Sequence, residues 1–93
     1  MRGGLTMYNK KYRLEKIEEF NKHNPIYEDA EGSTCYPAYF NVGEEGWFLC
    51  EYDDWFVPMH RIRTSVVQSV EYLEDRIILT TQNTRFTFVL IKE

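Results

Sequence analysis

The strongest constraint on the fold lies in the last third of the chain, in residues 66–90. Three runs rich in β-branched and aromatic residues are separated there by two polar pairs, Glu74-Asp75 and Gln82-Asn83. If each pair is the two-residue loop of a hairpin, the cross-strand partners can be counted outward from the loops. The count places an apolar row on one face of three antiparallel strands, made of Val70, Tyr72, Ile77, Leu79, Phe86 and Phe88.

This register of the three strands is favoured by burial. Side chains alternate along a strand, so a one-residue slip in either loop would scatter the apolar row over both faces. The opposite face is polar apart from Ile78, and it carries Ser69, Glu71, Thr80, Arg85 and Thr87. The pattern therefore predicts a three-stranded meander with one apolar face.

The size and composition predict a single globular domain. A chain of 93 residues supports one core, and 43% hydrophobic residues suffice for that core without disulfides or metal. Cys35 and Cys50 are expected to be buried, reduced thiols, because two cysteines do not make a secreted disulfide scaffold. No apolar run approaches the roughly 20 residues of a membrane span, and no signal-peptide pattern opens the chain, so a cytoplasmic protein is expected.

The N-terminal third predicts a helix over residues 9–23, preceded by a flexible segment, residues 1–8. Leu14, Ile17 and Phe20 recur at three-residue spacing on an otherwise charged run, which is typical of an amphipathic helix. Pro25 ends it, because the residue before a proline is disfavoured in helical geometry. This helix should cover the sheet as a plug or lid, and residues 25–35 should form a loop.

The remaining segments predict short antiparallel strands at residues 36–42, 47–52 and 55–63, with a hydroxyl-rich corner at Thr64-Ser65 leading into the meander. Alternation puts Tyr36, Ala38, Phe40 and Val42 on one face of the first strand. In the second strand it puts Trp47 and Leu49 on one side and Phe48, Cys50 and Tyr52 on the other. Pro37 favours an edge position for the first of them, because proline cannot donate to a strand ladder. The predicted fold class is mainly β (α+β). One N-terminal helix precedes about six antiparallel strands, which form a strongly curved sheet or partial barrel over residues 36–91 of a single domain, 9–93. An open sheet with the helix on one face is the alternative.

The residues that could carry catalysis or bind a metal do not form a recognisable motif. Cys35, Cys50, His23 and His60 lack the paired spacing of a zinc site, so neither a metal nor a cofactor is expected. Cys50, His60 and an acid from Asp53-Asp54 could be arranged as a nucleophilic triad, but an apolar strand raises the pKa of a thiol and suppresses its reactivity. The sequence therefore predicts a non-enzymatic protein.

The distribution of charge points instead to a protein partner. Residues 24–58 hold eight acids and neither lysine nor arginine, which favours a partner with a basic surface. Aromatic residues flank the acidic turn within this block, a composition typical of interface hot spots. The predicted partner-binding residues are Glu44, Glu45, Tyr52, Asp53, Asp54, Trp55, Phe56 and Met59. Trp55 and Phe56 could equally complete the core.

Two other kinds of partner remain open. Small curved barrels often bind single-stranded nucleic acid through aromatic and basic side chains, which here would be His60, Arg61, Arg63, Arg76 and Arg85. The acidic block opposes that reading, because it repels phosphate. A homo-oligomer could also form through an exposed edge at residues 36–42.

Three runs, GWFLCEYDD, HRIRTSVVQSVEY and RIILTTQNTRFTF, resemble a group of small phage and mobile-element proteins of Gram-positive gut bacteria. The resemblance covers residues 43–90 and transfers no catalytic residue. It implies an accessory protein in the cytoplasm of a bacterial host, such as a regulator or an inhibitor of host defence that acts on a CRISPR nuclease. Such proteins often act by occupying a nucleic-acid-binding surface.

Overall fold

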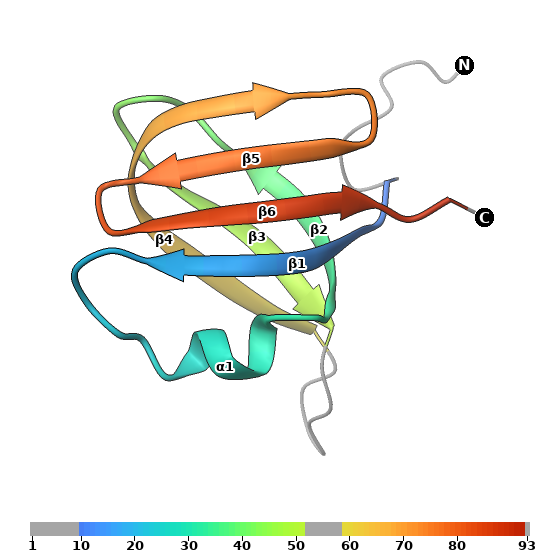
Figure 1. Ribbon diagram of the computed structural model, residues 1–93, viewed down its shortest axis with the longest axis horizontal. Helices are drawn as coiled ribbons and strands as arrows, with labels where there is room; N and C mark the ends of the chain where they lie inside the picture. The colour runs from blue at the N-terminus through green and yellow to red at the C-terminus, as the bar shows by residue number, and fades with distance from the viewer. Residues whose placement is uncertain (1–9, 52–58, 93) are drawn as a thin grey trace.

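The computed structural model describes residues 10–51 and 59–92, and these form a closed antiparallel barrel with one short helix (Figure 1). The strands pair in chain order, and the last pairs with the first to close the barrel. The elements are β1 (Tyr12–Glu19), α1 (Ile26–Ala30), β2 (Thr34–Tyr39), β3 (Glu45–Glu51), β4 (Met59–Tyr72), β5 (Arg76–Thr81) and β6 (Thr84–Leu90).

The predicted meander is confirmed residue by residue. Leu79 pairs with Val70 on one side and Phe86 on the other, and Ile77 pairs with Tyr72 and Phe88. The four members of the row on β5 and β6 are buried. On β4 the row reaches the surface, since Tyr72 is 55% exposed at the end of the hairpin. The predicted polar face lines a hollow of about 440 Å³ on the outside of the barrel, together with Glu18 of β1.

The mainly β fold class is confirmed, and the curved sheet closes completely. β2 pairs with β3 over much of its length and with β1 through Tyr12–Cys35 and Arg13–Thr34. The alternative of an open sheet is therefore wrong. Residues 36–39 pair in the ladders with β3 alone, which agrees with the edge position predicted for the proline-containing stretch. The ladder between β1 and β2 covers only two residue pairs, ending before Pro37, so a residue without an N–H is tolerated in a paired strand.

The predicted helix over residues 9–23 is wrong, because residues 12–19 form strand β1. Leu14 pairs with Phe88 and Ile17 with Phe86, so three steps along β1 match two along β6. A β-bulge between Leu14 and Lys16 absorbs the extra residue. The bulge turns both apolar side chains inward at the three-residue spacing of a helix, which is why the sequence pattern misleads.

The helix lies instead in the segment predicted as a loop. Tyr27 and Ala30 of α1 are buried, and the Tyr27 ring meets Phe86 edge-on at 5.3 Å between centroids. The helix thus covers one end of the barrel (Figure 1). The predicted role of a plug is filled by five residues after Pro25, not by the segment before it.

The predicted corner at Thr64-Ser65 does not separate two strands, because β4 runs through it unbroken as a long, curved strand (Figure 1). The strand pairs with β3 as far as Val66 and with β5 from Val67 onward. The register of each ladder shifts near this change of partner, where the strand bends. The Thr64 hydroxyl accepts a hydrogen bond from the Gly46 amide at 3.0 Å and donates one to the Ser65 carbonyl at 2.7 Å. The Thr64 hydroxyl therefore stabilises one continuous bent strand where the sequence suggested a corner between two strands.

A further bulge alters the face of β2. Pro37 pairs with Phe48, and Tyr39 pairs with Trp47, so the register shifts by one residue between them. Cys35, Pro37 and Phe40 consequently point inward, whereas the predicted alternation put Tyr36 on the same face as Phe40. Aromatic rings from β3, from β6 and from Phe40, the residue after β2, then fill the core. The Phe48 ring centre lies 5.1–6.5 Å from those of Phe40, Phe86 and Phe88.

The strand assignment of residues 12–19 is testable by a pair of substitutions. Leu14 is completely buried, so Leu14→Ala should lower the free energy of unfolding by about 2–5 kcal/mol. Phe20, which a helix would place on the same buried stripe, is 47% exposed, so Phe20→Ala should cost less than about 1 kcal/mol. Urea unfolding curves measure both, and equal losses would support the helix.

Candidate functional site

The outer surface of β2, β3 and β4 carries a mixed aromatic and cationic patch, here called the Trp47 face. In one cross-strand row Tyr36 pairs with Leu49 and Leu49 with Arg61, and in the next Tyr39 pairs with Trp47 and Trp47 with Arg63. Met59 extends the face opposite Glu51. The Trp47 face therefore consists of Tyr36, Tyr39, Trp47, Leu49, Met59, Arg61 and Arg63.

Gly46 is the reason that Trp47 points outward. Gly46, Phe48 and Cys50 alternate into the barrel. A Cβ at Gly46 would lie 2.8 Å from the Tyr39 carbonyl oxygen, closer than carbon and oxygen can approach, so this inward position admits no side chain. The register that buries Gly46 leaves the indole of Trp47 on the outside, partly exposed.

Charged groups are arranged around the indole. The Arg61 guanidinium lies 4.5 Å from the centre of the Trp47 ring, a cation–π contact. Arg63 pairs with Glu45 at 3.4 Å, and both side chains are well exposed. At the other end of β3 the Tyr36 hydroxyl donates a hydrogen bond to the Glu51 carboxylate. The aromatic centre thus has cations beside it and carboxylates at both ends.

Of the predicted partner-binding residues, the structure describes Glu44, Glu45 and Met59, and these three lie at opposite ends of β3. Glu44 and Glu45 stand at the start of β3, whereas Met59 pairs with Glu51 at its end. Glu44 accepts a hydrogen bond from the Tyr39 hydroxyl at 2.9 Å, and this carboxylate raises the pKa of Tyr39. Five predicted residues lie in residues 52–58, outside the described residues, and they are Tyr52, Asp53, Asp54, Trp55 and Phe56.

The predicted basic residues are divided among four places. Arg61 and Arg63 share the Trp47 face, whereas the Arg85 guanidinium lies on another face, 5.7 Å from the Phe20 ring. Arg76 follows Asp75 at the turn after β4 and lies 3.4 Å from its carboxylate. His60 pairs with Cys50, so it belongs to the inward row of β4. The five residues therefore form no continuous basic stripe.

Sequence reasoning placed Trp47 and Leu49 together on one side of a strand but did not identify the Trp47 face. The strand is apolar on both sides, so alternation alone leaves open which side is buried. The one available signal was Gly46, whose missing side chain marks a close approach of two backbones. Arg61 and Arg63 lie beside this strand because of the register between β3 and β4. Residues 52–58 separate these two strands in the chain, so alternation within β3 does not give that register.

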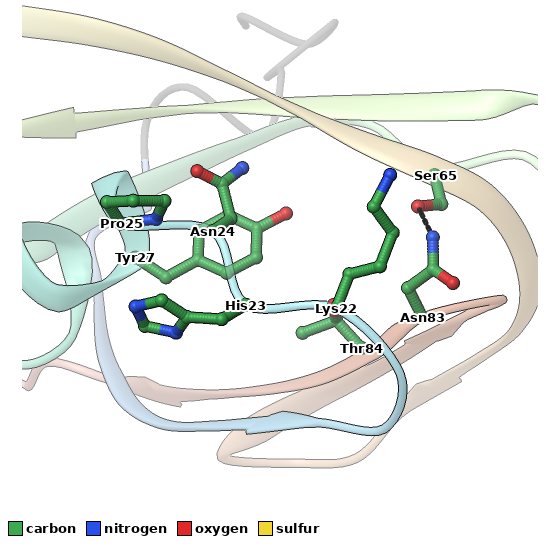
Figure 2. Close-up of a pocket in the computed structure, with 8 residues that line it drawn as sticks. All are labelled: Lys22, His23, Asn24, Pro25, Tyr27, Ser65, Asn83 and Thr84. Carbon is green, nitrogen blue, oxygen red and sulfur yellow. Dashed lines mark hydrogen bonds between the residues drawn. The ribbon is translucent and has the colours of Figure 1, made fainter.

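A second hollow lies at one end of the barrel, between the loop before α1, strand β4 and the turn between β5 and β6 (Figure 2). Its volume is about 270 Å³, and it is lined by Lys22, His23, Asn24, Pro25, Tyr27, Ser65, Asn83 and Thr84. The Asn83 side chain donates a hydrogen bond to the Ser65 hydroxyl at 2.7 Å. The lining is mostly polar and includes one lysine, so the hollow suits a small polar molecule. These lining residues include no nucleophile and base arranged for nucleophilic attack.

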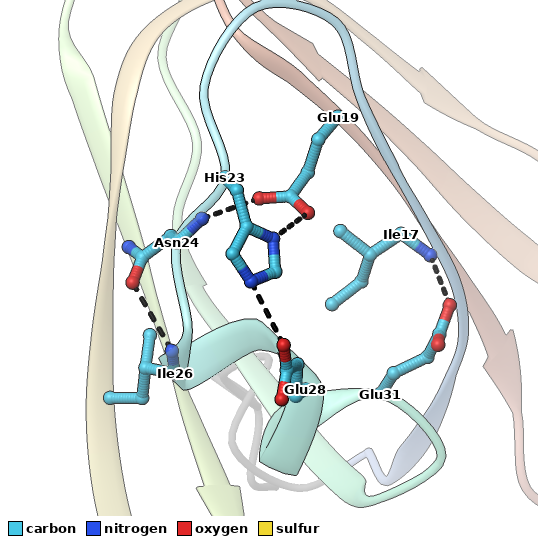
Figure 3. Close-up of polar contacts among 7 residues, drawn as sticks. All are labelled: Ile17, Glu19, His23, Asn24, Ile26, Glu28 and Glu31. Carbon is cyan, nitrogen blue, oxygen red and sulfur yellow. Dashed lines mark hydrogen bonds and ion pairs between the residues drawn. The ribbon is translucent and has the colours of Figure 1, made fainter.

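His23 joins two carboxylates beside this hollow (Figure 3). Its Nδ1 lies 3.0 Å from a Glu19 oxygen and its Nε2 lies 2.9 Å from a Glu28 oxygen. Neutral imidazole has one donor nitrogen, so only the imidazolium donates to both carboxylates. The hydrogen bond to Glu19, followed by that to Glu28, raises the pKa of His23. The Asn24 amide and then His23 lower the pKa of Glu19.

These two shifts define a pH dependence of stability. The contribution of His23 to the stability of the fold is fully present below its ordinary pKa of 6.5. It is lost as the pH rises through the raised pKa of the folded chain. The Glu19 contribution is present above its ordinary pKa of 4.5 and is lost as pH falls through the lowered value. The cluster therefore stabilises the fold most between these pH values.

We expect an NMR titration to give a pKa for His23 above 6.5, and Glu19→Gln should return it toward 6.5, because the strongest hydrogen-bond acceptor is neutralised. His60 in the same spectra is the internal control. A His23 pKa that is unaffected by Glu19→Gln would contradict the bridged arrangement.

No described helix is long and apolar enough to cross a membrane.

Comparison with known proteins gives no match. No family model matches the chain, and no curated protein or solved structure matches it either.

Proposed function

We propose that the protein is a non-enzymatic binding module that recognises another protein through the Trp47 face. The observation that carries the proposal is the outward, partly exposed indole of Trp47 with the Arg61 guanidinium stacked on it at 4.5 Å. Tryptophan, tyrosine, methionine and arginine are the side chains enriched at the centres of protein interfaces. A rigid barrel wall holds them at fixed spacing, which lowers the entropy lost on binding.

The charges around the Trp47 face suit a partner with basic side chains at its rim. Glu44, Glu45 and Glu51 border the aromatic centre, and the eight-acid block of the sequence adds to the negative field. Arg61 and Arg63 make the centre itself cationic, so the matching surface combines an apolar or acidic middle with a basic border. Complementary potentials of this kind raise association rates and reject wrong partners.

The surroundings of Cys50 support a role without catalysis. Cys50 is fully buried, and His60 pairs with it in the inward row of β4. Because Cys50 has no exposed surface, a substrate as large as a peptide or a nucleotide cannot reach its thiol. By covering the surface of a partner, a module of this size would act as a regulator or inhibitor, as the resemblance to phage and mobile-element proteins suggests.

The test is a comparison of matched variants in a pull-down from bacterial lysate treated with nuclease. Trp47→Ala and Arg61→Ala remove the indole and its stacked cation, and each should weaken binding of the captured partner by about thirtyfold or more, the loss of a hot spot of roughly 2 kcal/mol.

The controls are Phe20→Ala and Arg85→Ala, which remove a cation–π pair of the same kind from a different face. These two variants should retain the affinity of the unmodified chain, and circular dichroism checks that all four fold. Equal loss in both pairs, or no loss in either, would contradict recognition by the Trp47 face.

Binding of single-stranded nucleic acid is a second candidate, favoured by the placement of Trp47, Arg61 and Arg63 on one face. Bases stack on aromatic rings while arginines contact phosphates. If this candidate is correct, Arg63→Ala should weaken binding of a labelled oligonucleotide and reduce the slope of log K against log salt by about 1. Fluorescence anisotropy at several salt concentrations measures this, with Arg85→Ala as control. An oligonucleotide affinity that Arg63→Ala leaves unchanged would exclude this candidate.

A further inference from the structure

Strands β2 and β3 hold two cysteines directly opposite each other. Cys35 pairs with Cys50 in the antiparallel ladder, and both side chains point into the barrel with no exposed surface. Both are free thiols, as the sequence predicted. No role in the proposed function uses them.

The positions of the sulfur atoms suit a covalent bond between these strands. The two Sγ atoms lie 2.6 Å apart. Directly opposed residues on neighbouring antiparallel strands have Cβ atoms about 4.5–5.5 Å apart, close to the roughly 3.5–4.5 Å that a disulfide spans. A small approach of two adjacent, already paired strands therefore suffices, without any rearrangement of the barrel.

Ser33 gives the pair a polar border. Its hydroxyl lies 3.4 Å from the Cys50 sulfur and 3.7 Å from the Cys35 sulfur. The same hydroxyl lies 2.5 Å from the Ala30 carbonyl oxygen, and since it has one proton it can donate to only one acceptor at a time. Ser33 is only partly buried, so it connects the enclosed sulfurs to the protein surface.

We propose that Cys35 and Cys50 are a redox modification site, which hydrogen peroxide converts to an intramolecular disulfide and a dithiol reductant restores. The inference stands on the register of β2 and β3 and is independent of the proposed function.

The reaction proceeds in two balanced steps. The Cys50 thiolate attacks one peroxide oxygen, so an S–O bond forms, the O–O bond breaks, and the departing hydroxide takes up a proton to give water. The Cys35 sulfur then attacks the sulfur of the Cys50 sulfenic acid. The S–S bond forms, the S–O bond breaks, and the second water leaves with the Cys35 proton. The two sulfurs lose two electrons, which reduce one peroxide to two waters.

The local electrostatics support this order of attack. The hydrogen bond between the two thiols lowers the pKa of Cys50, so the raised pKa expected from its apolar strand is wrong for this residue. The pKa of Cys35 is raised by its bond to Cys50 and by burial. These opposite shifts make Cys50 the more acidic thiol of the pair and Cys35 the one that keeps its proton. The thiolate is the reactive form of a cysteine.

The experiment uses the full-length chain, folded and reduced, with hydrogen peroxide as the oxidant. Intact-mass spectrometry should show a monomer lighter by two hydrogens, and alkylation under denaturing conditions should label no cysteine where the reduced chain takes two labels. Dithiothreitol should restore both thiols. The expected thermal unfolding midpoint is higher for the oxidised form, because the cross-link constrains the unfolded chain.

Two variants check the assignment of roles. Cys35→Ser should stop at the Cys50 sulfenic acid, with the mass of one added oxygen and a dimedone adduct, whereas Cys50→Ser should react more slowly. A faster reaction in Cys50→Ser would overturn the order of attack. Adducts of oxygen on both cysteines of the unmodified chain, disulfide-linked dimers, or oxidation that occurs only after unfolding in urea would each overturn the proposed site.

Discussion

The pairing of β1 with β6 is the interaction on which the rest of the structure depends. Phe86 and Phe88 present an apolar wall that the meander alone cannot cover, and Leu14 and Ile17 of β1 pair directly with them. The bulge between Leu14 and Lys16 lets both side chains face the wall. The pairing of β6 with β1 closes the sheet into a barrel, which encloses a core that is dominated by aromatic rings.

Barrel closure also decides which side chains stand on the outer surface. Each strand has one inward and one outward row, so apolar residues beyond those needed for the core must stand outside. On β3 the inward row takes Gly46, Phe48 and Cys50, and this leaves Trp47 and Leu49 for the surface. The Trp47 face is thus a direct consequence of the register that satisfies the core, and Arg61 stabilises the exposed indole by covering it.

The inward and outward rows of β2 and β3 carry different chemistry within one pair of strands. The outward row offers aromatic, cationic and acidic groups at a rigid spacing, which suits recognition of a protein surface. The inward row brings Cys35 against Cys50, with Ser33 at the border, which suits reversible bond formation. The same cross-strand pairing positions both, because residues opposed in a ladder are held together by the backbone.

The sequence by itself determined the meander: the two polar pairs fix the loops, and period-two alternation then fixes the partners of Ile77 and Leu79. It also determined the mainly β class and the alternation of Phe48 and Cys50 against Trp47 and Leu49. Only the tertiary structure decided that residues 12–19 form a strand, because a bulge gives Leu14 and Ile17 the spacing of a helix. It alone decided that β4 bends without a turn, and that Arg61 meets Trp47. These features depend on long-range register, and local periodicity cannot encode where a bulge shifts it.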